Sequence, residues 1–167
     1  MDISIIVASQ GKNLELANRL QEIIRDKGKL SQIIDLCETQ LPLYTPKEEE
    51  KEIPTQAHKL NKTLKESKSF IILAPEYNGG VPPVMINALT WVSRCGKDWR
   101  DAFNDKHALL GTHSGGGGSH VLGAMRMQYS FIGVNILGRT LLTNYNKPLN
   151  EESANSCIDS LLKLIEA

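Results

Sequence analysis

Residues 69–94 read S-F-I-I-L-A-P-E-Y-N-G-G-V-P-P-V-M-I-N-A-L-T-W-V-S-R, a stretch that predicts a strand, a turn and a helix in succession. Phe70 to Ala74 is a short apolar run rich in β-branched residues, which is typical of a strand buried on both faces. The turn that follows, residues 75–80, contains residues that tolerate positive φ and let a ligand approach the backbone. Two prolines suit a helix start, and the apolar segment from 84 to about 94 continues the helix. Open α/β sheets bind their ligands in such turns, although a plain connecting turn is the alternative.

Length and charge limit the classes of function. At 167 residues the chain fits one domain, residues 1–167, with a sizeable core. Lys plus Arg and Asp plus Glu are both 19, so no basic excess favours nucleic acid. A small-molecule ligand is therefore the first expectation.

The cysteines and the start of the chain bear on location. Cys37, Cys95 and Cys157 lie far apart, with no CxxC or His-Cys cluster for a metal, and are typical of reduced thiols inside a cell. No stretch approaches the roughly 20 apolar residues of a membrane span, and the first apolar run is too short for a signal core. We expect a cytoplasmic protein without membrane or metal partners.

Apolar runs alternate with helical patterns along the whole chain, without a break in composition. This alternation predicts a parallel sheet with helices on both faces. In the order 2-1-3-4-5, the carboxyl ends of strands one, three and four are adjacent. The expected strands are 3–8, 32–36, 70–74, 107–112 and 134–142, and the expected helices are 14–26, 56–67, 84–94, 119–132 and one opening at 150 or 153. The charged segment 45–54 is expected to be a solvated loop or one short helical turn.

The turn after the first strand is a candidate phosphate site. Ser9, Lys12 and Asn13 add a hydroxyl, a cation and an amide to the free N–H groups and positive dipole of a helix N-terminus. Because neither common phosphate-loop motif is present, an ordinary helix start remains the alternative.

The turn after the fourth strand contains four consecutive glycines, residues 115–118, before Ser119, a candidate helix cap. Ordering so much glycine is entropically costly, so this segment is either a hinge or held against something flat. We expect His113 and His120 to be surface or supporting residues rather than metal ligands. Three such turns at one edge suggest a phosphorylated ligand with a large, flat, polar head.

The chain resembles the NADPH-dependent FMN reductase family, whose members have a flavodoxin-like fold. The segment A-P-E-Y-N-G-G-V-P-P-V-M-I-N-A-L-T-W at 74–91 is similar to that family's P-E-Y-N-G-S-x-P-x-x-x-K-N-A-x-D-W. I-D-L with L-P-L-Y at 34–44, and the segment 114–126, add to the resemblance. It implies a three-layer sandwich around a five-stranded parallel sheet in the order 2-1-3-4-5.

The resemblance also implies an oxidoreductase that uses FMN, with NAD(P)H as co-substrate and a flavin, quinone or azo compound as acceptor. No catalytic side chain is implied, because flavin carries the chemistry. The residues implied to bind FMN are Ser9, Lys12, Asn13 and Leu14 around the phosphate, Pro75, Glu76, Tyr77, Asn78 and Gly79 along the isoalloxazine, and Ser114, Gly115 and Gly116 at its pyrimidine side.

The phosphate turn departs from the family pattern G-S-x-R-x-x-S, since Gly11 replaces the arginine and Leu14 the second serine. A lysine point charge holds phosphate less well than an arginine fork, so we expect weak FMN binding. A flavodoxin-like electron carrier and a non-catalytic protein of the same fold stay open as alternatives. Segment 84–92 is apolar around most of its circumference, which favours a homodimer or homotetramer with Val81, Pro82 and Trp91 near a subunit boundary.

Overall fold

A computed structural model describes residues 1–166, in which five strands form one parallel sheet in the order β2-β1-β3-β4-β5. This arrangement confirms the order predicted from the alternation of strands and helices. The strands are β1 (Ile3–Val7), β2 (Ser31–Asp35), β3 (Ser69–Leu73), β4 (His107–His113) and β5 (Asn135–Thr143).

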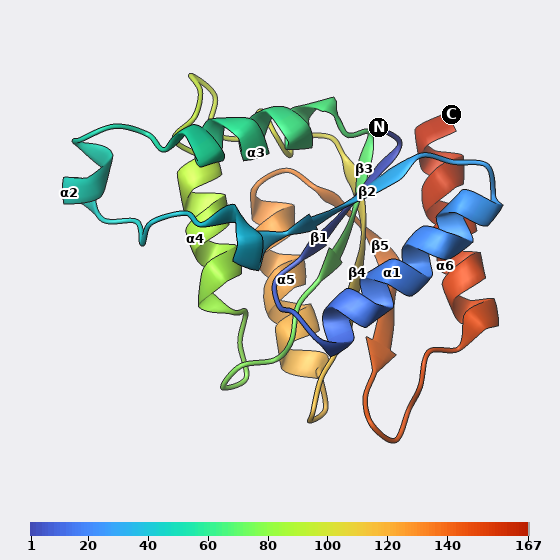
Figure 1. Cartoon of the computed structure of the whole chain (residues 1–167). Helices are drawn as coiled ribbons and strands as arrows, with labels where there is room; N and C mark the ends of the chain where they lie inside the picture. The colour runs from blue at the N-terminus through green and yellow to red at the C-terminus, as the bar shows by residue number, and fades with distance from the viewer. Residues whose placement is uncertain (167) are drawn as a thin grey trace.

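Helices cover both faces of the sheet (Figure 1). Apolar residues of α1 (Lys12–Asp26) and α6 (Glu151–Glu166) share one core cluster with one face of the strands. A second cluster lies on the other face, beneath α3 (Thr55–Glu66), α4 (Pro83–Val92) and α5 (Ser119–Phe131). The two clusters make the three-layer sandwich that the resemblance implied.

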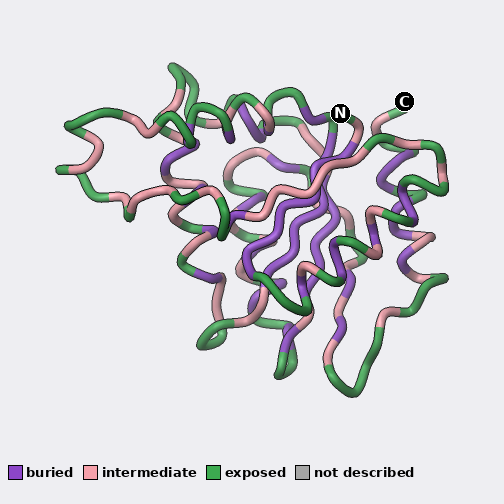
Figure 2. Tube along the Cα trace, in the orientation of Figure 1, coloured by how far each residue is buried: buried purple, intermediate pink, exposed green. Residues whose placement is uncertain are grey.

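The central strands are buried along their whole length (Figure 2). Every residue of β1 and β3 is buried, because helices cover both faces and neighbouring strands cover both edges. This explains why the two strands are apolar, apart from the buried Ser4 and Ser69, rather than alternating between apolar and polar residues. By contrast, every residue of the edge strand β2 is only half-buried.

The charged segment 45–54 contains one short helix, α2 (Pro46–Glu49), after the 3-10 helix η1 (Leu36–Thr39). In Figure 1 α2 extends away from the sheet, as expected for a solvated segment. The segment that leads into α2 is held against α4, because the Trp91 indole donates to the Pro42 carbonyl at 2.7 Å. Trp91 is fully buried and Pro82 is also buried within this single chain, and their place near a subunit boundary stays a prediction.

Residues 1–166 lack two kinds of feature. None of the helices there is long and apolar enough to cross a membrane. The same residues contain no group of three or more His, Cys, Asp or Glu side chains placed to hold a metal ion.

Lys106 joins two elements at the amino end of the sheet. Its ammonium donates to the carbonyls of Leu64, Lys65 and Ser67 at the end of α3, and it lies 5.4 Å from the centroid of the Phe70 ring. Burial lowers the pKa of Lys106 to about 8, because a charge loses hydration there. The carbonyls at the end of α3 therefore obtain their partner from a residue just before β4.

We expect Lys106→Met to lower the free energy of unfolding by about 2 kcal/mol, because three carbonyls lose a charged donor. Urea unfolding followed by circular dichroism measures the change. Lys62→Met is the matched control. Lys62 is exposed on α3, the helix whose end Lys106 contacts, and makes only a 3.8 Å pair with Glu66. Equal stability of the two variants would contradict the role of Lys106.

Candidate functional site

The turns after β1, β3 and β4 lie at one edge of the sheet, along the lower rim in Figure 1. Backbone hydrogen bonds continue the sheet to that edge, since the Ala8 N–H donates to the Leu73 carbonyl at 2.9 Å. Ser9, Pro75 and Ser114 start the three turns. The structure therefore brings together the three segments that the sequence singled out.

The first turn leaves the N-terminus of α1 open. Gly11 is the N-cap residue, with φ of 77°, and no side chain caps the helix. A side chain at this position would be strained by the positive φ, which explains a glycine where the family pattern has arginine. The first N–H groups of α1 have no acceptor within the helix, so they can bind an anion. The hydroxyl-bearing Ser9 beside them is buried, and Leu14 packs partly against the core.

The carboxamide of Asn13 links this turn to β4. Its Nδ2 donates to the His113 carbonyl at 3.0 Å, and its Oδ1 accepts from the His113 N–H at 2.8 Å. Asn13 is only 2% exposed. The side chain that we expected to add an amide to the phosphate site is thus fully used inside the protein, which leaves the backbone N–H of Asn13 as its group at the helix start.

The side chains of Lys12 and Gln10 in this turn also have partners. Lys12 is exposed, and its Nζ lies 2.7 Å from Glu15, which raises the pKa of the lysine. Gln10 donates to Glu38 at 2.6 Å and to Asp35 at 3.3 Å. Because an exposed ion pair contributes little free energy, Lys12 can exchange Glu15 for an anionic ligand at small cost.

The second turn is a tight hairpin. Tyr77 and Gly80 exchange two backbone hydrogen bonds, at 3.1 and 2.9 Å. Between them Asn78 and Gly79 have φ of 51° and 74°, the left-handed conformation that Asn and Gly tolerate. The Tyr77 ring is 52% exposed at this edge. The sequence prediction of positive φ in this turn is confirmed.

Glu76 connects the second turn with the helix of the third. Its carboxylate accepts from the Val121 N–H at 3.1 Å, in the first turn of α5. Ser119 is the first residue of α5, and Gly118, with φ of 70°, is the N-cap residue, so the expectation that Ser119 caps the helix was wrong. A carboxylate from another turn satisfies the helix dipole instead.

The third turn exposes the backbone. Gly115 and Gly116 are exposed, and a Cβ built on either would meet no atom closer than 3.9 Å. The buried hydroxyl of Ser114 accepts from the Gly116 N–H at 3.1 Å, which orders the start of the turn. The glycine segment is therefore open on its outer side and anchored at Ser114 and, through α5, at Glu76.

Sequence reasoning missed one residue of this edge. Tyr145, in the turn after β5, is 75% exposed, and its ring lies 5.3 Å from that of His113, in an edge-to-face arrangement. The sequence contained a signal for this residue, because a fifth parallel strand ends at the same edge as the others and the turn after it must lie there too. The His113 ring in turn contacts the Thr143 hydroxyl at 3.1 Å.

We expect Glu76→Ala to loosen the glycine turn. Loss of a helix cap costs about 1 kcal/mol, so amides 114–121 should exchange with deuterium roughly fivefold faster. Mass spectrometry of the ligand-free protein measures the rate. Glu76→Gln should show a smaller effect, because its amide oxygen can still accept, and Glu52→Ala on an exposed loop should show none. Unchanged exchange in Glu76→Ala would exclude the tether.

Comparison with known proteins adds a family and two kinds of relative. Residues 1–147 match the family described as NADPH-dependent FMN reductase. A Mycoplasma pneumoniae protein described as "Uncharacterized protein MG342 homolog" is 28% identical over 149 residues, which cover 80% of this chain and 86% of that protein.

Solved structures share the fold. The flavoenzyme FerB, an NAD(P)H:(acceptor) oxidoreductase from Paracoccus denitrificans, superimposes with a TM-score of 0.81 at 17% identity, over 99% of this chain and 97% of that one. An azoreductase from Bacillus anthracis gives a TM-score of 0.66 at 17% identity, over 99% and 94%. At such identities these structures support the flavodoxin-like fold alone. The family match, by contrast, spans most of the sequence and includes all three turns. The chain belongs to the NADPH-dependent FMN reductase family, and is an FMN oxidoreductase with NAD(P)H as electron donor.

Proposed function

We propose that this protein passes reducing equivalents from NAD(P)H through FMN to a small acceptor, a flavin, quinone or azo compound, by a ping-pong mechanism in which donor and acceptor use the same open face in turn. The observation that carries the proposal is the convergence of an uncapped helix N-terminus with two turns of exposed backbone at one edge of the sheet.

The residues at this edge fit FMN. The open amides at the start of α1 suit a phosphate, and a glycine there lets the ligand approach closely. Among the helices that follow β1, β3 and β4, α5 has its first turn occupied by Glu76, and α4 begins with Pro83, which has no N–H. The start of α1 is therefore the best anion acceptor of the three. In our proposal Ser9, Lys12 and the backbone of Asn13 and Leu14 hold the phosphate.

The other two turns would hold the flavin ring. FMN, when bound, supplies the hydride chemistry. The chain positions it with Pro75 to Gly79 on one side and Ser114 to Gly116 on the other. The left-handed turn at Asn78 and Gly79 presents backbone dipoles that do not reorganise when charge develops, which is how such groups stabilise a reduced ring. The proposal requires no side-chain acid or base.

Steady-state oxidation of NADH and NADPH, with and without added FMN, tests the proposal against a panel of flavin, quinone and azo acceptors. We expect turnover that depends on FMN and parallel lines in double-reciprocal plots, the sign of ping-pong kinetics. If the protein passed electrons to the acceptor only when a separate reductase supplied them, an electron carrier would be supported. If no donor and acceptor pair gave turnover, whether or not FMN was added, a non-catalytic protein would be favoured.

Lys12→Ala is expected to raise the dissociation constant of FMN roughly fourfold, because one exposed charge–charge contact with the phosphate is lost. Fluorescence quenching of FMN during titration with the ligand-free protein measures it. Lys51→Ala is the matched control, since Lys51 makes a similar exposed pair with Glu48, at 2.8 Å, on α2. Equal affinity in both variants would remove Lys12 from the phosphate site.

We also propose that the protein forms a homo-oligomer, through an apolar face between α4 and α5. A groove of about 610 Å³ lies there, lined mainly by Val81, Ile86, Ala124, Met127 and Phe131. Met127 and Phe131 are 77% and 68% exposed. Exposed apolar side chains gathered beside a binding site are typical of subunit interfaces, and Val81 places this face next to the second turn.

The double variant Met127→Glu, Phe131→Glu is expected to convert the oligomer into monomers, because it places charges in the apolar face. Light scattering after size-exclusion chromatography measures the mass. Leu30→Glu, on an exposed loop elsewhere, is the control and should leave the mass unchanged. A wild-type protein that is already monomeric at micromolar concentration would contradict the proposal.

A further inference from the structure

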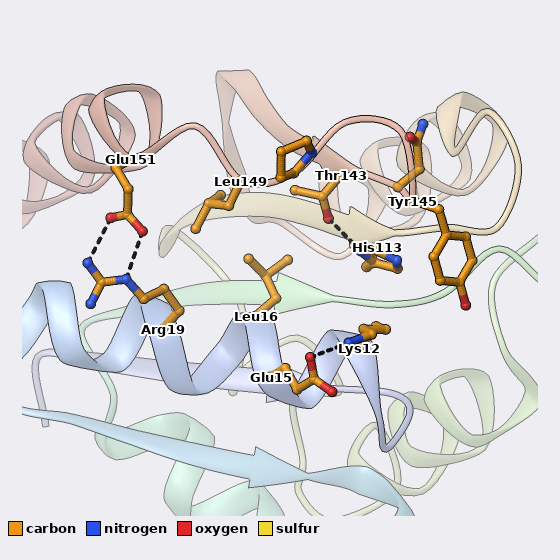
Figure 3. Close-up of a pocket in the computed structure, with 11 residues that line it drawn as sticks. Lys12, Glu15, Leu16, Arg19, His113, Thr143, Tyr145, Leu149 and Glu151 are labelled. Carbon is orange, nitrogen blue, oxygen red and sulfur yellow. Dashed lines mark hydrogen bonds and ion pairs between the residues drawn. The ribbon is translucent and has the colours of Figure 1, made fainter.

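A groove of about 350 Å³ starts at the N-terminus of α1 and runs along that helix toward α6 (Figure 3). Its floor contains Leu16 and His113, and the turn between β5 and α6 forms the opposite wall. The groove begins at Lys12, the first residue of α1, which also belongs to the candidate phosphate site. A ligand that extends beyond the phosphate can therefore continue into it.

The groove contains a buried nitrogen without a partner. The Thr143 hydroxyl donates to the Thr112 carbonyl at 3.0 Å, so its oxygen can only accept from Nδ1 of His113, 3.1 Å away. Nδ1 then carries a proton, and in the tautomer with its proton on Nδ1 the other nitrogen, Nε2, is an acceptor. Nε2 is buried and has no hydrogen-bond partner among residues 1–166. It suits a ligand hydroxyl or amino group, because an unsatisfied buried polar atom is costly.

The charges along the groove balance. Lys12 pairs with Glu15 at one end, and Arg19 makes two hydrogen bonds with Glu151 at the other, at 2.8 and 2.9 Å (Figure 3). The central part therefore favours a neutral group over a second phosphate. Lys12, whose ion pair is exposed and which lies at the start of α1, can turn toward an anion there.

The middle of the groove is apolar, with Leu16 and Leu149 facing each other across it (Figure 3). The Tyr145 ring stands beside His113 with most of its surface exposed. An apolar floor with an aromatic side chain at the rim is suited to a flat heterocycle. The heterocycle can stack on the aromatic ring and cover the apolar floor.

We propose that this groove binds the adenosine half of FAD, so that the protein accepts FAD as well as FMN. The inference rests on the proposed flavin site. The flavin-side phosphate would lie at the amides of α1, with Lys12 beside the second phosphate and the nucleoside in the groove. A ribose hydroxyl or the adenine amino group would donate to His113 Nε2. The balanced charges fit this neutral nucleoside.

Titration of the ligand-free protein with FMN, FAD and AMP tests the proposal. We expect FAD to bind at least as tightly as FMN, and AMP alone to shift the NMR signals of groove amides. Tyr145→Ala should weaken FAD roughly tenfold, because base stacking on an aromatic ring contributes about 1–3 kcal/mol. Leu149→Arg, which fills the groove, should weaken FAD by at least as much. Leu149→Arg should leave FMN affinity within about twofold of wild type.

The outcomes separate the two proposals. FMN binding without FAD binding, or FAD binding unaffected by both variants, overturns the FAD site and leaves the proposed function intact. AMP displaced by NADH but not by FAD assigns the groove to the electron donor and also overturns it. A chain that binds neither flavin overturns the proposed function together with the FAD site. Leu43→Arg, on an exposed loop, is the control for the added charge.

Discussion

The hydrogen bonds between the Asn13 carboxamide and the backbone of His113 are the contact on which the binding edge depends. β1 and β4 do not touch, because β3 lies between them. The helix α1 instead packs across this face of the sheet and reaches β4, where the Asn13 side chain sets the distance from the first turn to the third. Asn13 does so with a donor and an acceptor at once, and its burial keeps water from competing for either bond.

Glu76 makes the complementary connection from the second turn to the third. Together the two contacts tie three turns to one another through side chains and leave the outward-facing backbone of each turn free. This resolves the difficulty that four consecutive glycines present. The segment is anchored at Ser114 and at the start of α5, so it can stay open to a ligand without behaving as a hinge. Preorganised backbone groups of this kind are what a flavin site needs.

Some features of the site could be predicted from the sequence and others could not. The turn at Asn78 and Gly79 was predictable, because left-handed φ is a local preference of those residues. The role of Asn13 was not, since its partner is 100 residues away. For the same reason Ser119 resembled a helix cap, whereas the carboxylate that performs this function comes from Glu76. The cover over Trp91 was not predictable either, since the Pro42 carbonyl that accepts from its indole lies 49 residues away in the chain.

The sequence by itself determined the class of fold, the strand order and the turns that form the edge, because hydrophobic periodicity, glycine and proline act over a few residues. Its similarity to a known family also indicated the cofactor. Only the tertiary structure decided which side chains are available to a ligand. Asn13 and Glu76 are committed to the protein's own backbone, whereas Tyr145 and Nε2 of His113 face a groove along α1. Such commitments depend on contacts between residues far apart in the chain, which no local pattern contains.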